Sequence, residues 1–103
     1  MQVCDETALE QEIRAVLAKH RCGLRGHRVL LFGSRARGES HRRSDFDLGV
    51  DGDDSLGLST FFEVQADLEQ IPTLYRIDWV DLNRAPGKLR EQARLQGRTI
   101  YEG

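Results

Sequence analysis

Two short apolar segments, joined by a stretch rich in glycine and arginine, constrain the fold of this chain more than any other part of its sequence. Residues 29–32 form a continuous apolar run of the kind found in buried strands, and a Gly-Ser pair follows them directly. Residues 46–50 form a second such run, which two aspartates spaced i, i+2 introduce. A candidate phosphate-binding turn and a candidate metal-binding pair are therefore joined by one short connection.

The rest of the sequence alternates between helical and strand patterns. Apolar spacing and flanking glycine or proline residues predict helices over residues 7–20, 34–39, 58–70 and 86–96, and strands over 28–32, 46–50, 75–82 and 99–101. Residues 51–54, Asp-Gly-Asp-Asp, are expected to form a turn. This alternation favours an α/β or α+β fold, with helices packed on a sheet of about four strands.

Length and composition fit a single domain over residues 1–103, with 39% hydrophobic and 31% charged residues. No segment approaches the roughly 18 consecutive apolar residues of a membrane span, so no membrane partner is expected. The N-terminus lacks the basic start and apolar centre of a signal peptide, which favours a cytoplasmic location. Cys4 and Cys22 are too few for a disulfide framework and are expected to be free thiols.

The formal net charge of −2 conceals a strong segregation of charge along the chain. Residues 19–43 hold eight Lys or Arg side chains and a single acid, whereas residues 45–54 hold five aspartates and no base. Arginine suits phosphate oxygens, so this juxtaposition fits a ligand that combines phosphate and metal. The overall acidic balance argues against direct nucleic-acid binding.

The Gly33-Ser34 pair is the candidate phosphate-binding element. A helix that starts there would offer unpaired backbone N–H groups and the positive end of its dipole to an anion. Gly33 lets the backbone approach a phosphate without a Cβ in the way, and Ser34 adds a hydroxyl. A Gly-Ser pair after a strand is by itself a weak signal, because most such pairs are simple turns.

Asp45 and Asp47 are the candidate metal ligands. Side chains at i and i+2 of a strand share a face, so both carboxylates point the same way while Phe46 and Leu48 point into the core. Carboxylate oxygens, completed by water and substrate phosphates, are the ligands that Mg²⁺ prefers. Most isolated pairs of this kind are surface carboxylates, so the adjoining apolar strand is what favours a functional role here.

A third carboxylate, Asp78, interrupts the apolar strand expected over residues 75–82. An ionised carboxylate buried there without a partner would be costly. If this strand adjoins residues 46–50, Asp78 joins the other two aspartates and can help to activate an incoming hydroxyl. Asp81 is the competing candidate, but it has the opposite strand parity and lies nearer the end of the strand.

Residues 33–50, Gly-Ser-x-Ala-Arg-Gly followed by Ser-Asp-x-Asp-Leu, resemble the signature of the minimal nucleotidyltransferases, the smallest members of the DNA polymerase β-like nucleotidyltransferase superfamily. Ten residues separate Ser34 from Asp45, as in the family's pattern. The segment Arg-Ile-Asp-Trp-Val-Asp, residues 76–81, is similar to the family's third-carboxylate strand. The resemblance covers almost the whole chain and implies a palm-like fold with a mixed central sheet.

The resemblance also implies a chemistry. Gly33 and Ser34 would bind the triphosphate of ATP, the substrate, and the three aspartates would be both catalytic residues and ligands of Mg²⁺ or Mn²⁺. Asp78 would promote attack on the α-phosphate, with pyrophosphate as the leaving group. Arg37 either supports the phosphates or braces the turn through a carboxylate, and both roles stay open.

Stand-alone domains of this kind resemble the antitoxin half of HEPN–MNT toxin–antitoxin pairs. Some members of that family transfer AMP from ATP to a tyrosine of the HEPN partner and so silence it. The expected partners are therefore a HEPN-type toxin and a nucleoside triphosphate, in a homo- or hetero-oligomer. Two alternatives stay open: a binding module that neutralises its partner by complex formation, and a nucleotidyltransferase that acts on a small molecule or RNA.

Overall fold

The computed structural model describes residues 6–32, 46–73 and 75–103. The elements are α1 (Glu6–Lys19), β1 (His27–Phe32), β2 (Phe46–Gly52), α2 (Leu58–Glu69), β3 (Ile77–Asp81), α3 (Gly87–Gln96) and β4 (Arg98–Glu102). The predicted alternation of helices and strands and the α+β fold class are confirmed. The helix predicted over residues 34–39 falls outside the described residues.

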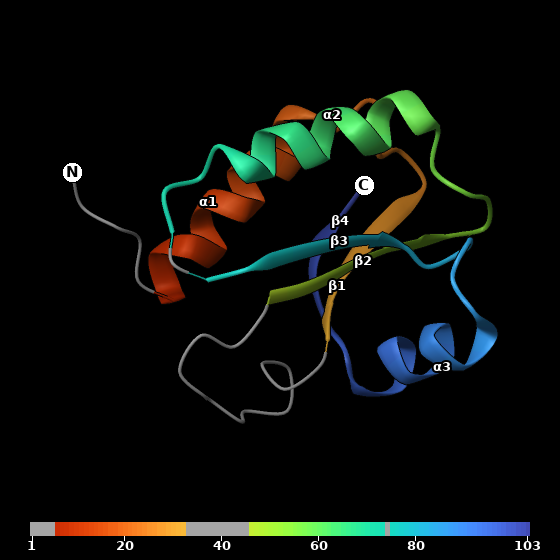
Figure 1. Cartoon of the computed structure of the whole chain (residues 1–103). Helices are drawn as coiled ribbons and strands as arrows, with labels where there is room; N and C mark the ends of the chain where they lie inside the picture. Colours follow the sequence, from red (N-terminus) through yellow and green to blue (C-terminus); the bar gives the residue numbers. More distant parts are fainter. Residues whose placement is uncertain (1–5, 33–45, 74) are drawn as a thin grey trace.

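The four strands form one mixed sheet in the order β3-β2-β1-β4 (Figure 1). Strand β1 is antiparallel to both β2 and β4, whereas β2 and β3 are parallel. A parallel pair requires a crossover connection, and α2 provides it between β2 and β3. This arrangement confirms the prediction of a mixed central sheet and makes β3 one of its two edges.

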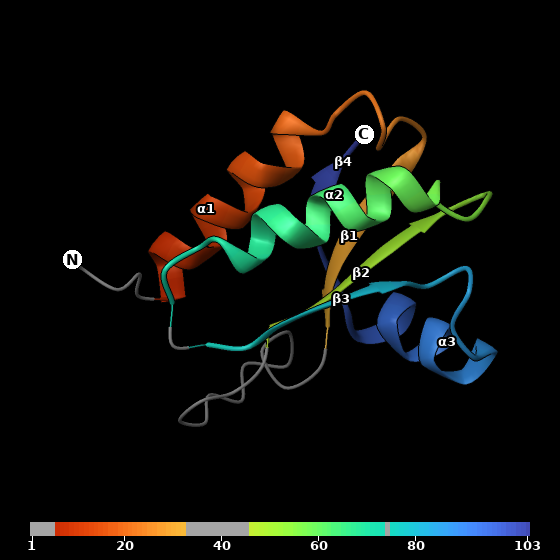
Figure 2. The same ribbon diagram turned by 45° about the horizontal axis from the view of Figure 1, so that its top comes forward.

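The helices divide between the two faces of the sheet, with α1 and α2 on one face and α3 on the other (Figures 1 and 2). The larger hydrophobic core lies under α1 and α2, and each fully buried aliphatic or aromatic side chain there contributes about 1.5–3 kcal/mol. A smaller cluster under α3 contains Leu30, Phe32, Leu82 and Ala93. None of the helices in the described residues is long and apolar enough to cross a membrane.

Strand β2 contributes to both faces because its side chains alternate. Phe46 and Leu48 are buried in the core under α1 and α2, as the sequence predicts. Asp47, Gly49 and Asp51 consequently point to the α3 side. The acidic residues of β2 are thus separated from the larger core by the sheet itself.

The prediction of a turn over residues 51–54 is wrong at its beginning. Strand β2 continues through Asp51 to Gly52, and the bend is confined to residues 53 and 54. Asp51 pairs with Arg28 of β1 in the register of the sheet, and its side chain is only 2% exposed. A strand can hold a buried aspartate there because arginine side chains surround the carboxylate.

Gly49 is the residue of β2 at which the packing is closest. A Cβ at this position would lie 2.7 Å from two side-chain carbons of Leu82, which is fully buried. We expect Gly49→Ala to lower the free energy of unfolding by about 1–2 kcal/mol, because Leu82 must shift within a packed cluster. Urea denaturation measures this change. Gly87→Ala, where a Cβ meets no atom within 4 Å, is the control and should cause no loss.

Candidate functional site

Asp47 of β2 and Asp78 of β3 occupy the same register position on two parallel strands. Neighbouring strands lie about 4.8 Å apart, and side chains at paired positions point to the same face. The two carboxylates therefore project side by side from the α3 side of the sheet, and both residues are half-buried. The sequence places Asp78 at the site only if its strand lies next to residues 46–50, and the pairing of β3 with β2 satisfies this requirement.

Three other predicted site residues are adjacent in sequence to the strands that carry this position. Phe32, the last residue of β1, pairs with Asp47, so the Gly33-Ser34 pair follows β1 at this end of the sheet. Asp45 directly precedes Phe46, the first residue of β2. Gly33, Ser34, Arg37 and Asp45 themselves lie outside the described residues, and their roles stay predictions.

Asp78 has an arginine beside it. The Nε atom of Arg76 lies 3.4 Å from Oδ1 of Asp78, with the two side chains 75% and 36% exposed. The backbone N–H of Phe46 donates to the carbonyl of Arg76 at 2.7 Å, which continues the pairing of β2 and β3 one residue before β3 begins. An ion pair so exposed contributes less than about 1 kcal/mol, so it leaves the Asp78 carboxylate available to a ligand.

Asp81, the competing candidate, has a structural role, because its carboxylate is occupied by contacts within the fold. Its side chain is buried, and its carboxylate accepts hydrogen bonds from the backbone N–H groups of Leu56 and Asn83, both at 3.0 Å. Arg84 adds an ion pair at 3.3 Å. These contacts hold together the loops that follow β2 and β3, and they favour Asp78 over Asp81 as the third carboxylate of the site.

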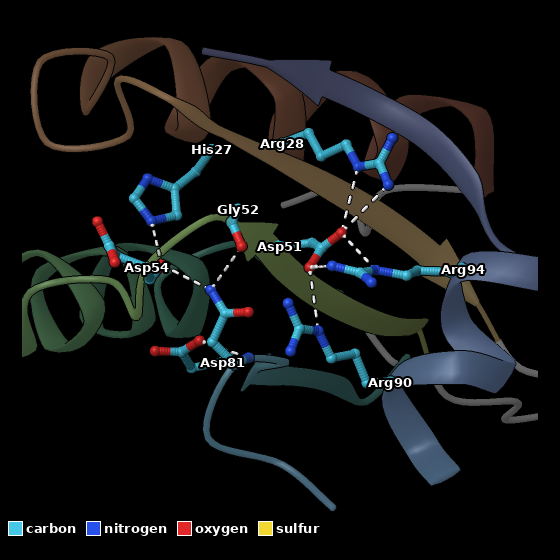
Figure 3. Close-up of polar contacts among 9 residues, drawn as sticks. His27, Arg28, Asp51, Gly52, Asp54, Asp81, Arg90 and Arg94 are labelled. Atoms are coloured by element: carbon cyan, nitrogen blue, oxygen red, sulfur yellow. Dashed lines mark hydrogen bonds and ion pairs between the residues drawn. The ribbon is translucent and has the colours of Figure 1, made fainter. Parts of the chain in front are cut away.

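Asp51 is the buried acid whose role the sequence did not indicate. Arg94 of α3 donates to both carboxylate oxygens, at 3.0 and 2.9 Å, and Arg28 of β1 donates at 3.2 Å. Arg90 adds an ion pair at 3.6 Å, and Figure 3 shows the three guanidinium groups converging on this carboxylate. Asp51 lies four residues from Asp47 on the same face of β2, so it anchors α3 at the opposite end of the strand.

The surroundings of Asp51 also determine its ionisation. Burial raises the pKa of the Asp51 carboxyl, but the hydrogen bonds from Arg94 and Arg28 outweigh it, and the net pKa is below the usual value. Asp51 is therefore ionised at neutral pH with its oxygens occupied by arginine, which makes it a structural anchor rather than a metal ligand. The spacing i, i+4 of Arg90 and Arg94, together with the shared parity of Asp47 and Asp51, is the only sequence signal of this cluster.

The donor set at Asp47 and Asp78 suits a hard divalent cation. Two carboxylates on one face of adjacent strands supply the oxygen ligands that Mg²⁺ or Mn²⁺ prefers. Within residues 6–32, 46–73 and 75–103, no three His, Cys, Asp or Glu side chains are grouped to bind a metal. A complete three-carboxylate site therefore depends on Asp45.

The sequence model of the family described as polymerase beta, nucleotidyltransferase matches residues 11–103. The chain belongs to this nucleotidyltransferase family. The match includes residues 33–50 and both aspartates at the paired position of β2 and β3. No curated protein sequence matches the nucleotidyltransferase chain.

Solved structures of two kinds share the fold of this nucleotidyltransferase. A toxin–antitoxin complex with AMP-PNP is 28% identical over 91% of this chain and 73% of the other, with a TM-score of 0.62. A minimal nucleotidyltransferase is 28% identical over 89% of each chain, with a TM-score of 0.56. The MNT antitoxin complex with a tri-AMPylated Shewanella oneidensis HEPN toxin shares the fold at 24% identity, 96% and 74% coverage, and a TM-score of 0.63. These comparisons confirm the resemblance to minimal nucleotidyltransferases and MNT antitoxins.

Proposed function

We propose that this nucleotidyltransferase transfers AMP from ATP to a tyrosine hydroxyl of a HEPN-type toxin and thereby acts as its antitoxin. The observation that carries the proposal is the paired position of Asp47 and Asp78 at the end of the sheet where β1 leads into Gly33 and Ser34. A toxin–antitoxin relative bound to AMP-PNP supports both the nucleotide and the partner. The proposal places the chain in the cytoplasm, as a single domain over residues 1–103.

In the proposed reaction, the acceptor oxygen forms a bond to the α-phosphorus of ATP. The bond from that phosphorus to the oxygen bridging the α- and β-phosphates breaks, and pyrophosphate leaves. Asp78 accepts the proton of the acceptor hydroxyl as a general base. Gly33, Ser34 and Arg37 hold the triphosphate, so positioning supplies much of the catalysis.

The aspartates would also hold the metal. Asp45, Asp47 and Asp78 would bind Mg²⁺ or Mn²⁺, which supplies neutralisation of phosphate charge when bound. Among these, Asp47 and Asp78 lie at paired positions of adjacent strands. The protein's own contribution is to fix the carboxylates on a rigid sheet, so that they need no rearrangement as charge develops.

One observation favours the alternative of a binding module that neutralises its partner without chemistry. Leu58 and Phe62 of α2 are 54% and 58% exposed. A helix packed on a sheet usually buries its large apolar side chains, so this exposure is unusual. The two side chains are spaced i, i+4 and therefore lie next to each other on the outer surface of α2. An exposed apolar pair of this kind suits contact with another protein.

Incubation with ATP labelled at the α-phosphate and the protein encoded by the adjacent gene tests the proposed function. We expect Mg²⁺-dependent labelling of the partner on a tyrosine, located by mass spectrometry, and no labelling from ATP labelled at the γ-phosphate. Absence of label on a partner that is folded and bound would contradict the proposal and favour the binding module. Label on RNA or a small molecule instead would support the remaining alternative.

A further inference from the structure

Within the described residues, the outer edge of β3 carries backbone hydrogen-bonding groups without a partner on either side of Asp78. The carbonyl of Arg76 accepts from Phe46 of β2, and the N–H of Leu82 donates to Val50 of β2. The N–H and C=O of one residue in a strand point to the same side and alternate along the chain. Residues 76, 78, 80 and 82 therefore direct their backbone groups to β2, whereas Ile77 and Trp79 direct theirs outward.

This edge is open in the part of the chain that the structure describes. Strand β3 is terminal in the sheet order, and Figures 1 and 2 show no other described element beside its outer side, which runs between α2 and α3. None of the backbone hydrogen bonds within residues 6–32, 46–73 and 75–103 satisfies the outward groups of Ile77 or Trp79. An open strand edge is a template for pairing with an extended peptide.

A small hollow adjoins the beginning of this edge. Its volume is about 140 Å³, and its lining is mainly apolar, consisting of Leu68, Glu69, Ile71, Thr73, Tyr75 and Ile77. Ile77 packs against the core under α1 and α2, so the hollow opens on the face of β3 opposite to Asp78. The side chains of a peptide strand beside β3 would also alternate between the two faces of the sheet. One side chain would lie next to Asp78, and the following one would face the hollow.

We propose that the outer edge of β3 between Ile77 and Trp79 binds the acceptor segment of the protein partner as an added extended strand. The hydroxyl-bearing residue of that segment lies beside Asp78, and an adjacent apolar residue enters the hollow. The inference rests on the proposed function, because it takes a protein hydroxyl as the acceptor. The partner chemistry follows from the edge itself, since free N–H and C=O groups at alternate residues match another peptide backbone and do not match a nucleic acid.

Side-chain geometry supports this placement of the acceptor. Residues at opposed positions of adjacent strands have Cβ atoms about 4.5–5.5 Å apart. A hydroxyl residue opposed to Asp78 would therefore share its face with both Asp78 and Asp47, which are paired across β2 and β3. The added strand needs no rearrangement of the sheet, so the docking surface is formed before the partner binds.

Amide hydrogen exchange tests the docking without requiring catalysis. The full chain is compared alone and in complex with the protein encoded by the adjacent gene, with α,β-methylene-ATP present to prevent transfer. We expect exchange at the Ile77 and Trp79 amides to slow by roughly tenfold or more in the complex. Unchanged exchange at both amides, in a complex shown to be intact by size-exclusion chromatography, would overturn the inference.

A proline substitution provides the matched functional test. Ile77→Pro removes one outward N–H and leaves the hydrogen bonds between β2 and β3 intact, a position at which edge strands tolerate proline. Ile77→Val is the control, because valine has a similar size and keeps the N–H. We expect Ile77→Pro to raise the KM for the partner roughly threefold to tenfold relative to Ile77→Val, with an unchanged KM for ATP.

Equal KM values for the partner in the two folded variants would overturn the docking site even if AMP transfer proceeds. Failure of the proposed function has a different signature. In that case the wild-type chain transfers no AMP to the partner, while exchange at the Ile77 and Trp79 amides still reports whether a peptide strand is bound at the edge. If Ile77→Pro does not fold, the exchange measurement on the unmodified chain decides alone.

Discussion

Replacement of Asp47 or Asp78 by asparagine is expected to lower AMP transfer to the partner by at least roughly 10²–10³-fold. The two residues are paired on adjacent strands, so each substitution removes one negative charge from the same point of the site. Asparagine keeps the shape of aspartate but cannot accept the proton of the acceptor hydroxyl or hold a divalent cation as strongly. The rate of label transfer from α-labelled ATP under single-turnover conditions measures the loss.

The matched control for these variants is Asp53→Asn. Asp53 is exposed and lies in the bend after β2, so the same chemical change occurs away from the paired carboxylates. All three variants should unfold at similar urea concentrations and should bind the partner with similar affinity. Transfer by Asp47→Asn within about threefold of wild type would contradict the assigned site. Loss of transfer with intact toxin neutralisation would instead favour the binding module.

The sequence predicts the fold and this pair of aspartates because their signals are local. The apolar runs, the proline and glycine residues and the alternation of helix and strand each depend on a few neighbouring residues. The position of Asp78 in an apolar strand indicates a role, and strand parity separates it from Asp81. The sheet order then shows that β3 adjoins β2, which places Asp78 beside Asp47.

The sequence could not predict features that depend on residues far apart in the chain. Asp51 reads as part of a turn because Asp-Gly-Asp-Asp is a common turn composition, and its partners Arg28 and Arg94 are 23 and 43 residues away. The apolar spacing that predicts the helix over residues 58–70 does not separate its buried side chains from its exposed ones. Its core side follows the spacing of Phe61, Val64 and Leu68, whereas Phe62 is more than half exposed. Burial decides both cases, and burial is a property of the assembled sheet.

Asp51 contributes to the free energy of unfolding, and this contribution should depend on pH. Its pKa is lowered in the folded chain, because the hydrogen bonds from Arg94 and Arg28 outweigh the effect of burial. A carboxyl with a lowered folded pKa contributes stability above its unfolded pKa of about 3.9, and that contribution is lost as the pH falls through the folded pKa. We therefore expect Asp51 to stabilise the chain fully at pH 7 and progressively less below about pH 4.

Replacement of Asp51 by alanine should accordingly lower the free energy of unfolding at pH 7 by about 2–3 kcal/mol. Removing one partner of a fully buried ion pair costs about 3–5 kcal/mol, and the cost here is lower because Arg28 and Arg94 are 47% and 43% exposed and can regain water. The loss of unfolding free energy caused by Asp51→Ala should be smaller at pH 3 and in high salt. The control is Glu91→Gln, which removes an acid from the exposed side of α3. If Asp51→Ala lowers the free energy of unfolding by the same amount at pH 7 and at pH 3, the prediction is wrong. Packing, rather than the three guanidinium groups, would then hold α3 on the sheet.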